Sequence, residues 1–303
     1  MNQELGKKLL SILKEEQVKK DEPMKNHTTF RVGGPAAYFV TPQTVEEVSK
    51  VIEACTQENV PYYIVGNGSN LLVSDKGYEG VIIQIYKQMN QVEVEGTQIR
   101  AQAGALLSMI AKRALDAELT GFEFAAGIPG TLGGACVMNA GAYGGEMKDV
   151  LQSVTVLTDK GEVKVLAKEE LELGYRTSVI AKKGYIVLEA VIELQKGEKE
   201  AIQTVMDELK EKRVTKQPLE YPSAGSTFKR PEGYFAGKLI QDAGLRGFQV
   251  GGAQVSEKHC GFVINKDQAT ASDVMNLMNQ VSDKVYEAFG VRLEPEVKRL
   301  GEF

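Results

Sequence analysis

The chain has 303 residues, of which 43% are hydrophobic and 25% charged, and its formal net charge is −5. This length predicts two or three domains, and the composition is typical of a globular enzyme. The acidic balance argues against a nucleic-acid partner. No apolar run approaches the roughly eighteen residues that span a bilayer, so we expect no membrane partner. The first twenty residues interleave acids and lysines, which indicates an amphipathic helix, and we expect no signal peptide there.

The three cysteines and two histidines lie far apart and form no C-x-x-C pair and no metal-ligand spacing. They are Cys55, Cys136, Cys260, His27 and His259. We therefore expect reduced thiols, a cytoplasmic location and no protein-bound metal.

In the first half of the chain, residues 44–60 are predicted to form a helix, because Thr44 and Glu47 have capping-box spacing ahead of an apolar face. Residues 62–85 read as strand, loop, strand, turn and strand, and residues 91–104 as a hairpin. The apolar spacing of residues 105–119 predicts a second helix.

In the second half, residues 153–167 are predicted to form a hairpin that turns at 159–161, and residues 185–197 a further strand. A charged helix is expected from about Glu198 to Arg213, and a long helix from near Ser272 with Phe289 on its buried face. The closing segment is extended and is broken by Pro295. Short strands and separate helices favour an α+β fold over a regular βαβ array.

Two glycine-rich loops are candidate sites for a ligand that carries a pyrophosphate. Residues 66–70, "GNGSN", fail as a Rossmann fingerprint, because Leu71 replaces the third glycine and a strand follows in place of a helix. Their backbone N–H groups can still form an anion nest, as can those of Gly127 to Gly134. Two tight structural turns are the alternative that the spacing leaves open.

Ser226 in "YPSAGSTFKRP" is a candidate catalytic hydroxyl, although no G-x-S-x-G elbow surrounds it. A turn serine that bonds its own backbone is the alternative. Basic side chains bracket this loop and suit a phosphate group near it, although a solvated helix face is the better reading for two of them, Lys210 and Lys212. The others are Arg213, Lys216, Lys229, Arg230 and Lys238.

Six segments occur in the order and at the distances found in one enzyme family. They are "NHTTFRVGG", "GNGSNLLV", "GFEFAAGIPGTLGGACVMNAGAYG", "LGYRTSVI", "SAGSTFKRP" and "LEPEVKRLG". From about Asn26 to Leu300, the chain resembles the UDP-N-acetylenolpyruvoylglucosamine reductases. These flavoenzymes use NADPH to reduce an enolpyruvyl nucleotide sugar to UDP-N-acetylmuramate, a peptidoglycan precursor.

The resemblance implies an FAD-binding fold of the p-cresol methylhydroxylase type, in which residues 1–80 (rejoined by 295–303) and 81–197 form two α+β subdomains. Residues 198–294 would form the substrate-binding domain, and we expect a monomer. The implied FAD-binding residues are Gly66, Asn67, Gly68, Ser69, Asn70, Gly127, Ile128, Pro129, Gly130, Gly134, Asn139 and Gly141. The implied substrate-binding residues are Arg213, Lys216, Lys229, Arg230 and Lys238.

The family uses one arginine, one serine and one glutamate in catalysis, and these match Arg176, Ser226 and Glu296 by motif. Hydride from the reduced flavin N5 would reach the β-carbon of the enolpyruvyl group, with Arg176 stabilising the enolate. Ser226 would then protonate the α-carbon as a general acid, which requires no neighbouring histidine. Glu296 would polarise the enol or re-supply the proton through water.

The sequence departs from some family members at two places. Arg230 stands where these members have asparagine, and there is no room after residue 191 for the tyrosine-bearing loop that some of them fold over substrate. The chain thus resembles the subgroup that lacks this loop. Two alternatives remain: an FAD oxidase of the same fold, often with covalently bound flavin, and a catalytically inert nucleotide-sugar binding protein.

Overall fold

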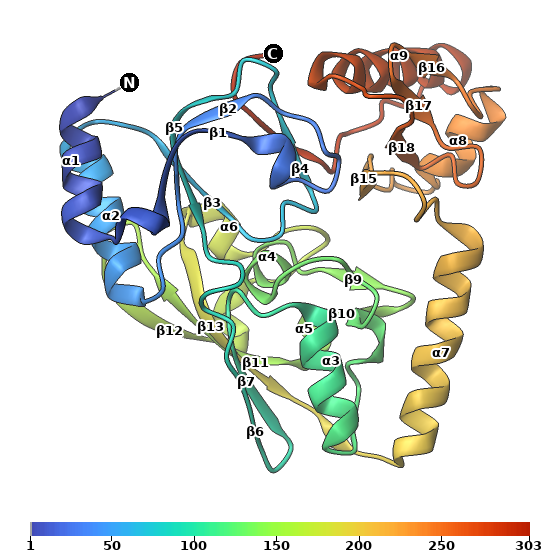
Figure 1. Ribbon diagram of the computed structural model, residues 1–303. Helices are drawn as coiled ribbons and strands as arrows, with labels where there is room; N and C mark the ends of the chain where they lie inside the picture. The colour runs from blue at the N-terminus through green and yellow to red at the C-terminus, as the bar shows by residue number, and fades with distance from the viewer. Residues whose placement is uncertain (1) are drawn as a thin grey trace. The chain divides into compact units, whose positions relative to one another are not determined.

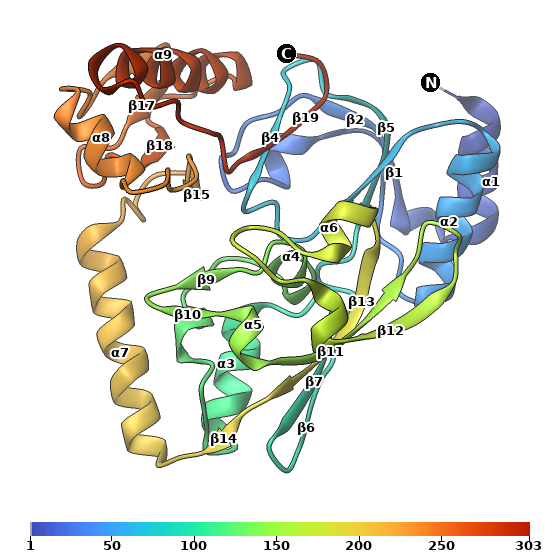
Figure 2. The same cartoon turned by 180° about the vertical axis from the view of Figure 1, so that it is seen from behind.

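The computed structural model describes residues 2–303, and the chain divides into two compact units (Figures 1 and 2). Unit 1 comprises Met1–Lys19, Tyr38–Asn67 and Val81–Arg213. Unit 2 comprises Lys20–Ala37, Gly68–Gly80 and Val214–Phe303. The chain thus passes repeatedly between the units. The sequence analysis predicts two FAD-binding subdomains and one substrate-binding domain. This division does not test their boundaries, which stay a prediction.

A five-stranded antiparallel sheet forms the centre of unit 1. Its order is β12 (Val163–Ala167), β11 (Leu151–Leu157), β13 (Ile186–Glu193), β7 (Gln98–Gln102) and β6 (Val92–Glu95). Both predicted hairpins are confirmed, since β6 pairs with β7 and β11 with β12. Unit 1 also contains two short antiparallel pairs, β8 (Leu119–Thr120) with β14 (Gln195–Lys196) and β9 (Gly141–Ala142) with β10 (Gly145–Glu146).

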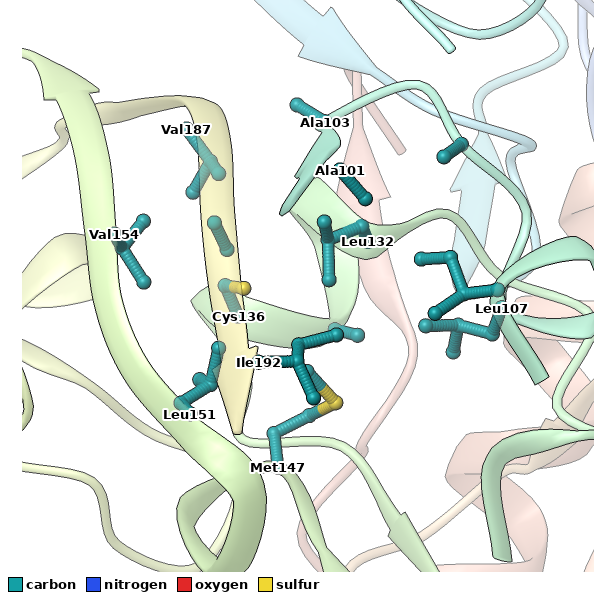
Figure 3. Packing of buried hydrophobic residues seen from close by; sticks show 14 of the residues in the cluster. Ala101, Ala103, Leu107, Leu132, Cys136, Met147, Leu151, Val154, Val187 and Ile192 are labelled. Atoms are coloured by element: carbon teal, nitrogen blue, oxygen red, sulfur yellow. The ribbon is translucent and has the colours of Figure 1, made fainter. Parts of the chain in front are cut away.

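The helices of unit 1 contribute apolar side chains to its core. They are α1 (Gln3–Ile12), α2 (Val45–Gln57), α3 (Leu107–Asp116), α4 (Leu132–Val137), α5 (Met147–Val150) and α6 (Val179–Lys183). Figure 3 shows Leu132 and Cys136 of α4 close to Ile192 of β13, and all three side chains are buried. The predicted helices are confirmed at α2, whose Thr44 cap accepts a hydrogen bond from Glu47 N at 3.1 Å, and at α3.

The segment 62–84 also folds as predicted. Strands β3 (Tyr62–Val65), β4 (Leu71–Val73) and β5 (Tyr78–Gln84) follow one another, and β3 runs parallel to β5. A four-stranded sheet has the order β1 (Val18–Pro23), β2 (Pro35–Val40), β5 and β3. Because β4 is a strand, the first glycine loop does not lead into the helix that a Rossmann site requires.

Unit 2 is built on a second antiparallel sheet in the order β15 (Ser223–Ser226), β18 (Phe262–Asn265), β17 (Ala253–Val255) and β16 (Gln249–Val250). Helices α8 (Ala236–Asp242) and α9 (Ala271–Phe289) contribute to its separate apolar core. Strand β19 (Lys298–Leu300) pairs in parallel with β4.

The long C-terminal helix differs from the prediction at one residue. Five predicted core side chains of α9 are buried: Val274, Leu277, Met278, Val281 and Val285. The prediction for Phe289 is wrong, since it is 41% exposed in the last turn before the Gly290 cap. Helical periodicity identifies the apolar face, but it does not show where the packing partners end.

The charged helix predicted for about 198–213 is α7 (Lys199–Lys216), of which Ile202 is the buried residue. The division between the units falls within this helix, after Arg213. Nowhere in residues 2–303 is there a helix with the length and apolarity needed to cross a membrane.

Candidate active site

The two glycine loops of the sequence approach each other in unit 1. Asn67 Nδ2 donates a hydrogen bond to Pro129 O at 2.7 Å. A Cβ added to Gly66 would lie 2.2 Å from Oγ1 of Thr131, a side chain that is 3% exposed. Glycine at residue 66 is therefore required for the contact between the loops, and the role of Thr131 could not be read from the sequence.

Backbone hydrogen bonds fix the second loop to α3 and its preceding segment. Leu107 N donates to Gly130 O at 3.1 Å, and Leu132 N donates to Ala105 O at 2.8 Å. Gly134 lies exposed in α4, and a Cβ added there would have its nearest neighbour at 4.0 Å. The protein itself therefore does not require glycine at residue 134, and this open position fits the close approach of a ligand such as FAD.

The rest of the first loop belongs to unit 2. Gly68 has a φ of +63°, and a Cβ there would lie 2.0 Å from His27 O. Thr29 N donates to Gly68 O at 3.2 Å, and within the described residues the buried Thr29 Oγ1 has no hydrogen-bond partner. A buried hydroxyl without a partner carries a free-energy cost that a ligand oxygen would remove. This unsatisfied hydroxyl of unit 2 fits a polar group of FAD.

Asn139 and Gly141 lie beyond α4. The Asn139 side chain donates to Glu146 Oε2 at 2.7 Å and to Gly174 O at 3.1 Å. A Cβ on Gly141 would lie 2.7 Å from Gly145 O across the β9–β10 hairpin. The structure thus gives both residues roles in unit 1 itself, and their predicted contact with FAD stays a prediction.

Arg176 occupies a tight turn of unit 1. Gly174 N donates to Thr177 O at 3.1 Å, and Thr177 N donates to Gly174 O at 3.3 Å. Within the turn, Arg176 has a φ of +55°, and its guanidinium lies 5.2 Å from the centre of the Tyr175 ring. Such left-handed backbone at a non-glycine residue is uncommon and is often found at functional sites.

The segments of Ser226 and Glu296 are hydrogen-bonded to each other in unit 2 through Thr227, the residue after Ser226. This threonine is fully buried, and its backbone O accepts from Glu296 N at 2.9 Å. Its Oγ1 accepts from Val263 N at 2.9 Å, and its N donates to Gly261 O at 2.9 Å. A β-bulge precedes Ser226, which is exposed at the end of β15. Bulges commonly redirect a side chain at a functional site.

Asn70, predicted to bind FAD, contacts the same segment. Its Nδ2 donates to Glu296 O at 3.2 Å, and its backbone O accepts from Lys298 N at 3.0 Å. Sequence reasoning missed Thr227 altogether and did not link Asn70 to Glu296. No local signal could have shown either role, because the partners lie far away along the chain.

The predicted substrate-binding cations have different surroundings. Arg213 is half-buried in unit 1, with its guanidinium 5.8 Å from the Tyr143 ring centre, and burial lowers the pKa of Arg213. Its Nε would lie 2.6 Å from a Cβ on Gly127. Arginine stays charged after such a shift, so it still offers a cation beside the second glycine loop.

The remaining cations belong to unit 2. Lys216 is exposed at the end of α7, and Lys229 forms an ion pair with Glu294. Arg230 stacks on Phe235 with 3.9 Å between the guanidinium carbon and the ring centre. Lys238 pairs with Asp242 along α8 at 2.5 Å. The structure therefore distributes the predicted substrate-binding residues over both units, and their contacts with substrate stay predictions.

Comparison with known proteins identifies two matching families. Residues 36–167 match the FAD binding domain family, and residues 217–300 match the family described as UDP-N-acetylenolpyruvoylglucosamine reductase, C-terminal domain. The chain is 54% identical to the UDP-N-acetylenolpyruvoylglucosamine reductase of Clostridioides difficile (strain 630) over 301 residues, which are 99% of each chain. The chain belongs to the UDP-N-acetylenolpyruvoylglucosamine reductase family. It therefore carries an FAD-binding domain, and the predicted family is confirmed.

Another relative, the UDP-N-acetylenolpyruvoylglucosamine reductase of Agathobacter rectalis, is 55% identical over 315 residues and the full length of both chains. Among solved structures, the reductase of this family from Thermus caldophilus has a TM-score of 0.80 at 38% identity, over 92% of this chain and 97% of that one. Alkyldihydroxyacetonephosphate synthase, with a TM-score of 0.50 and 18% identity over 65% of this chain and 41% of its own, shares the fold alone. The predicted α+β fold class with an FAD-binding domain of the p-cresol methylhydroxylase type is confirmed.

Proposed function

We propose that the protein is an FAD-dependent oxidoreductase that uses NADPH to reduce UDP-N-acetylglucosamine enolpyruvate to UDP-N-acetylmuramate, in peptidoglycan precursor synthesis. Its relatives carry the reductase name over the full length of the chain. The geometric observation that carries the proposal is the hydrogen bond from Glu296 N to the backbone O of Thr227, which joins the segment of Glu296 to the residue after Ser226. A proton donor and a carboxylate on adjoining backbone segments are the groups that reduction of an enol ether requires.

Each catalytic residue has a distinct task in this proposal. The chemistry that bound FAD would supply is hydride transfer from NADPH to the substrate. Arg176 stabilises the negative charge that develops on the substrate carboxylate and α-carbon. Ser226 Oγ holds the proton that the α-carbon receives, and Glu296 helps to restore that proton. Residues around the glycine loops hold the pyrophosphate of FAD, and the basic residues between 213 and 238 hold the nucleotide sugar.

The decisive experiment compares the two half-reactions in wild type, Ser226→Ala and Ser226→Cys. Ser226→Ala should fold, bind FAD and be reduced by NADPH at the wild-type rate. Substrate should then reoxidise its flavin more slowly by about 100- to 10,000-fold, because a positioned acid is lost. Ser226→Cys should recover part of this loss, because a thiol also donates a proton.

A wild-type reoxidation rate in Ser226→Ala would refute the assignment of Ser226 as the acid. Two further outcomes test the overall reaction. Rapid oxygen-dependent turnover without the enolpyruvyl substrate would favour an oxidase, and binding without any turnover would favour an inert nucleotide-sugar binding protein. We further propose that the enzyme acts in the cytoplasm and that it is a monomer. Sedimentation of the purified holoenzyme would test the oligomeric state.

A further inference from the structure

The side-chain amide of Asn139 is fully used inside unit 1. The residue is 1% exposed, and its Oδ1 accepts a hydrogen bond from Lys148 N at 2.8 Å. Its Nδ2 donates to Glu146 Oε2 at 2.7 Å and to Gly174 O at 3.1 Å. An asparagine amide has two N–H donors, and the protein occupies both. The reverse orientation of the amide would place its oxygen against a carboxylate and a carbonyl, so the network fixes the orientation.

The bond to Gly174 supports the turn that carries Arg176. Gly174 O accepts from both Thr177 N, at 3.3 Å, and Asn139 Nδ2. The left-handed backbone of Arg176, with φ +55°, is a conformation that persists only where the surrounding structure fixes it. Asn139 supplies such support on the N-terminal side of the turn.

A second contact supports the C-terminal side. Ser178 Oγ donates to Val137 O at 2.6 Å and accepts from Ala181 N at 3.2 Å, which caps α6. Val137 is the last residue of α4, the helix that follows the second glycine loop, and Asn139 comes directly after its C-cap Met138. The end of α4 therefore holds the backbone on both sides of Arg176.

We propose that Asn139 is a positioning residue for Arg176, and that its side chain acts on this arginine turn and not on FAD. The inference rests on the proposed function, in which Arg176 stabilises negative charge on the substrate. Charge stabilisation depends on placement of the cation to within a fraction of an ångström. Asn139 fixes that placement through the carbonyl of Gly174.

Asn139→Gly removes the amide without backbone strain, because glycine readily adopts the φ of +45° found at this residue. FAD content and reduction by NADPH should stay within about threefold of wild type, whereas reoxidation by substrate should slow by about 10- to 100-fold. Amide hydrogen exchange of residues 174–177 should accelerate. Unchanged protection of this turn would overturn the proposal, whether or not the enzyme turns over.

Two variants that place a carboxylate at residue 139 separate the positioning of Arg176 from the general stability of the protein. Asn139→Asp alone places two carboxylates together, whereas Asn139→Asp with Glu146→Gln restores a donor–acceptor pair between these side chains. In both proteins the bond to Gly174 O is lost. The double variant should regain only part of the lost thermal stability, because the new carboxylate still faces the carbonyl of Gly174, and it should keep the slow reoxidation. Recovery of both properties together would show a structural role only and would overturn the proposal.

A double-mutant cycle tests whether the effect passes through Arg176. In an Arg176→Lys background, Asn139→Gly should slow reoxidation by less than about threefold further, because residues that act through one another are not additive. If the reductions in reoxidation rate caused by the two substitutions instead multiply, Asn139 acts separately on FAD or substrate. Failure of the wild-type protein to reduce the enolpyruvyl substrate would contradict the proposed function. Wild-type reoxidation by Asn139→Gly, in an enzyme that is active, would contradict only the positioning role.

Discussion

At the scale of single residues, glycines of similar appearance in the sequence have different requirements in the structure. At Gly66 and Gly68 an added Cβ would meet Thr131 or the carbonyl of His27. Substitution there would damage the protein whether or not FAD binds. Loss of the yellow FAD colour in such a variant would therefore not show that the glycine contacts FAD. Gly134 is different, because the protein leaves open space for a Cβ.

Gly134→Ala therefore tests the FAD cradle directly. Without FAD the variant should be as stable as wild type or more stable by about 0.5–1 kcal/mol, since alanine is the better helix former. The affinity for FAD should fall by at least about tenfold, which corresponds to 1.4 kcal/mol. Thermal unfolding of the FAD-free protein and titration with FAD provide the two measurements. Unchanged affinity would mean that FAD does not approach residue 134.

His259 provides a second prediction at this scale. Burial lowers its pKa, and its Nδ1 accepts a hydrogen bond from Gly261 N at 3.1 Å, which requires the neutral ring. Below the unfolded-state pKa of about 6.5, the unfolded chain binds a proton that the folded protein resists. The free energy of unfolding should therefore decrease as the pH falls through this value toward the lower folded-state pKa.

His259→Asn keeps an acceptor near the position of Nδ1 and cannot titrate. Its urea midpoint should fall less than that of wild type between pH 7.5 and pH 5, while the carboxylates contribute equally to both proteins. The comparison of the two pH profiles is the measurement. Parallel profiles would contradict the assignment of this pH dependence to His259.

At the scale of elements, Thr227 joins three segments of unit 2: the loop after β15, strand β18 and the segment that carries Glu296. Thr227→Val keeps the shape but leaves the buried N–H of Val263 without its acceptor, which should cost about 1–3 kcal/mol of unfolding free energy. Thr227→Ser keeps the hydroxyl and is the matched control. Urea unfolding of the three proteins should place Thr227→Ser close to wild type. A loss in Thr227→Ser with none in Thr227→Val would show that the threonine methyl group matters and the hydroxyl does not.

Local elements could be predicted because their signals are local. Helices α2 and α3 follow from a cap and an apolar face, and the turn between β3 and β4 follows from its small residues. The parallel pairing of β4 with β19, and the bond from Asn70 to Glu296 over 226 positions, have no such signal. Pairing between distant segments depends on tertiary packing, which propensity does not encode.

The residues of the candidate site were predicted from the family motifs. The family motifs led to Ser226 and Glu296, and the structure pairs their segments. The same motifs assign Asn139 to FAD, which stays a prediction, and the structure shows its amide bonded to Glu146 and Gly174. A sequence shows that an asparagine stands in a glycine-rich segment, whereas only the fold shows which groups are left to satisfy it.

At the scale of the whole molecule, the cysteine thiols, one of the two kinds of group that attach flavin covalently in some oxidases, are poorly placed to do so here. Cys55, Cys136 and Cys260 are buried, and burial raises the pKa of the first two thiols to about 12 and that of Cys260 as well. The thiolate is the reactive form of cysteine, so these thiols are inert near neutral pH. His27 Nε2 contacts Glu22 Oε1 at 2.8 Å, and the Nδ1 of His259 is occupied by Gly261 N.

FAD should therefore be held without a covalent bond. Acid denaturation of the holoenzyme should release all yellow colour into the supernatant, and the mass of the denatured chain should equal that of the unmodified sequence. The native holoenzyme should also react slowly with a thiol reagent at pH 8, and denaturation should make all three cysteines of the sequence reactive. The denatured protein is the control for reagent quality. Flavin that stays with the precipitated chain would instead support an oxidase with covalently attached cofactor, and its attachment site could be found by peptide mapping at the cysteines and histidines.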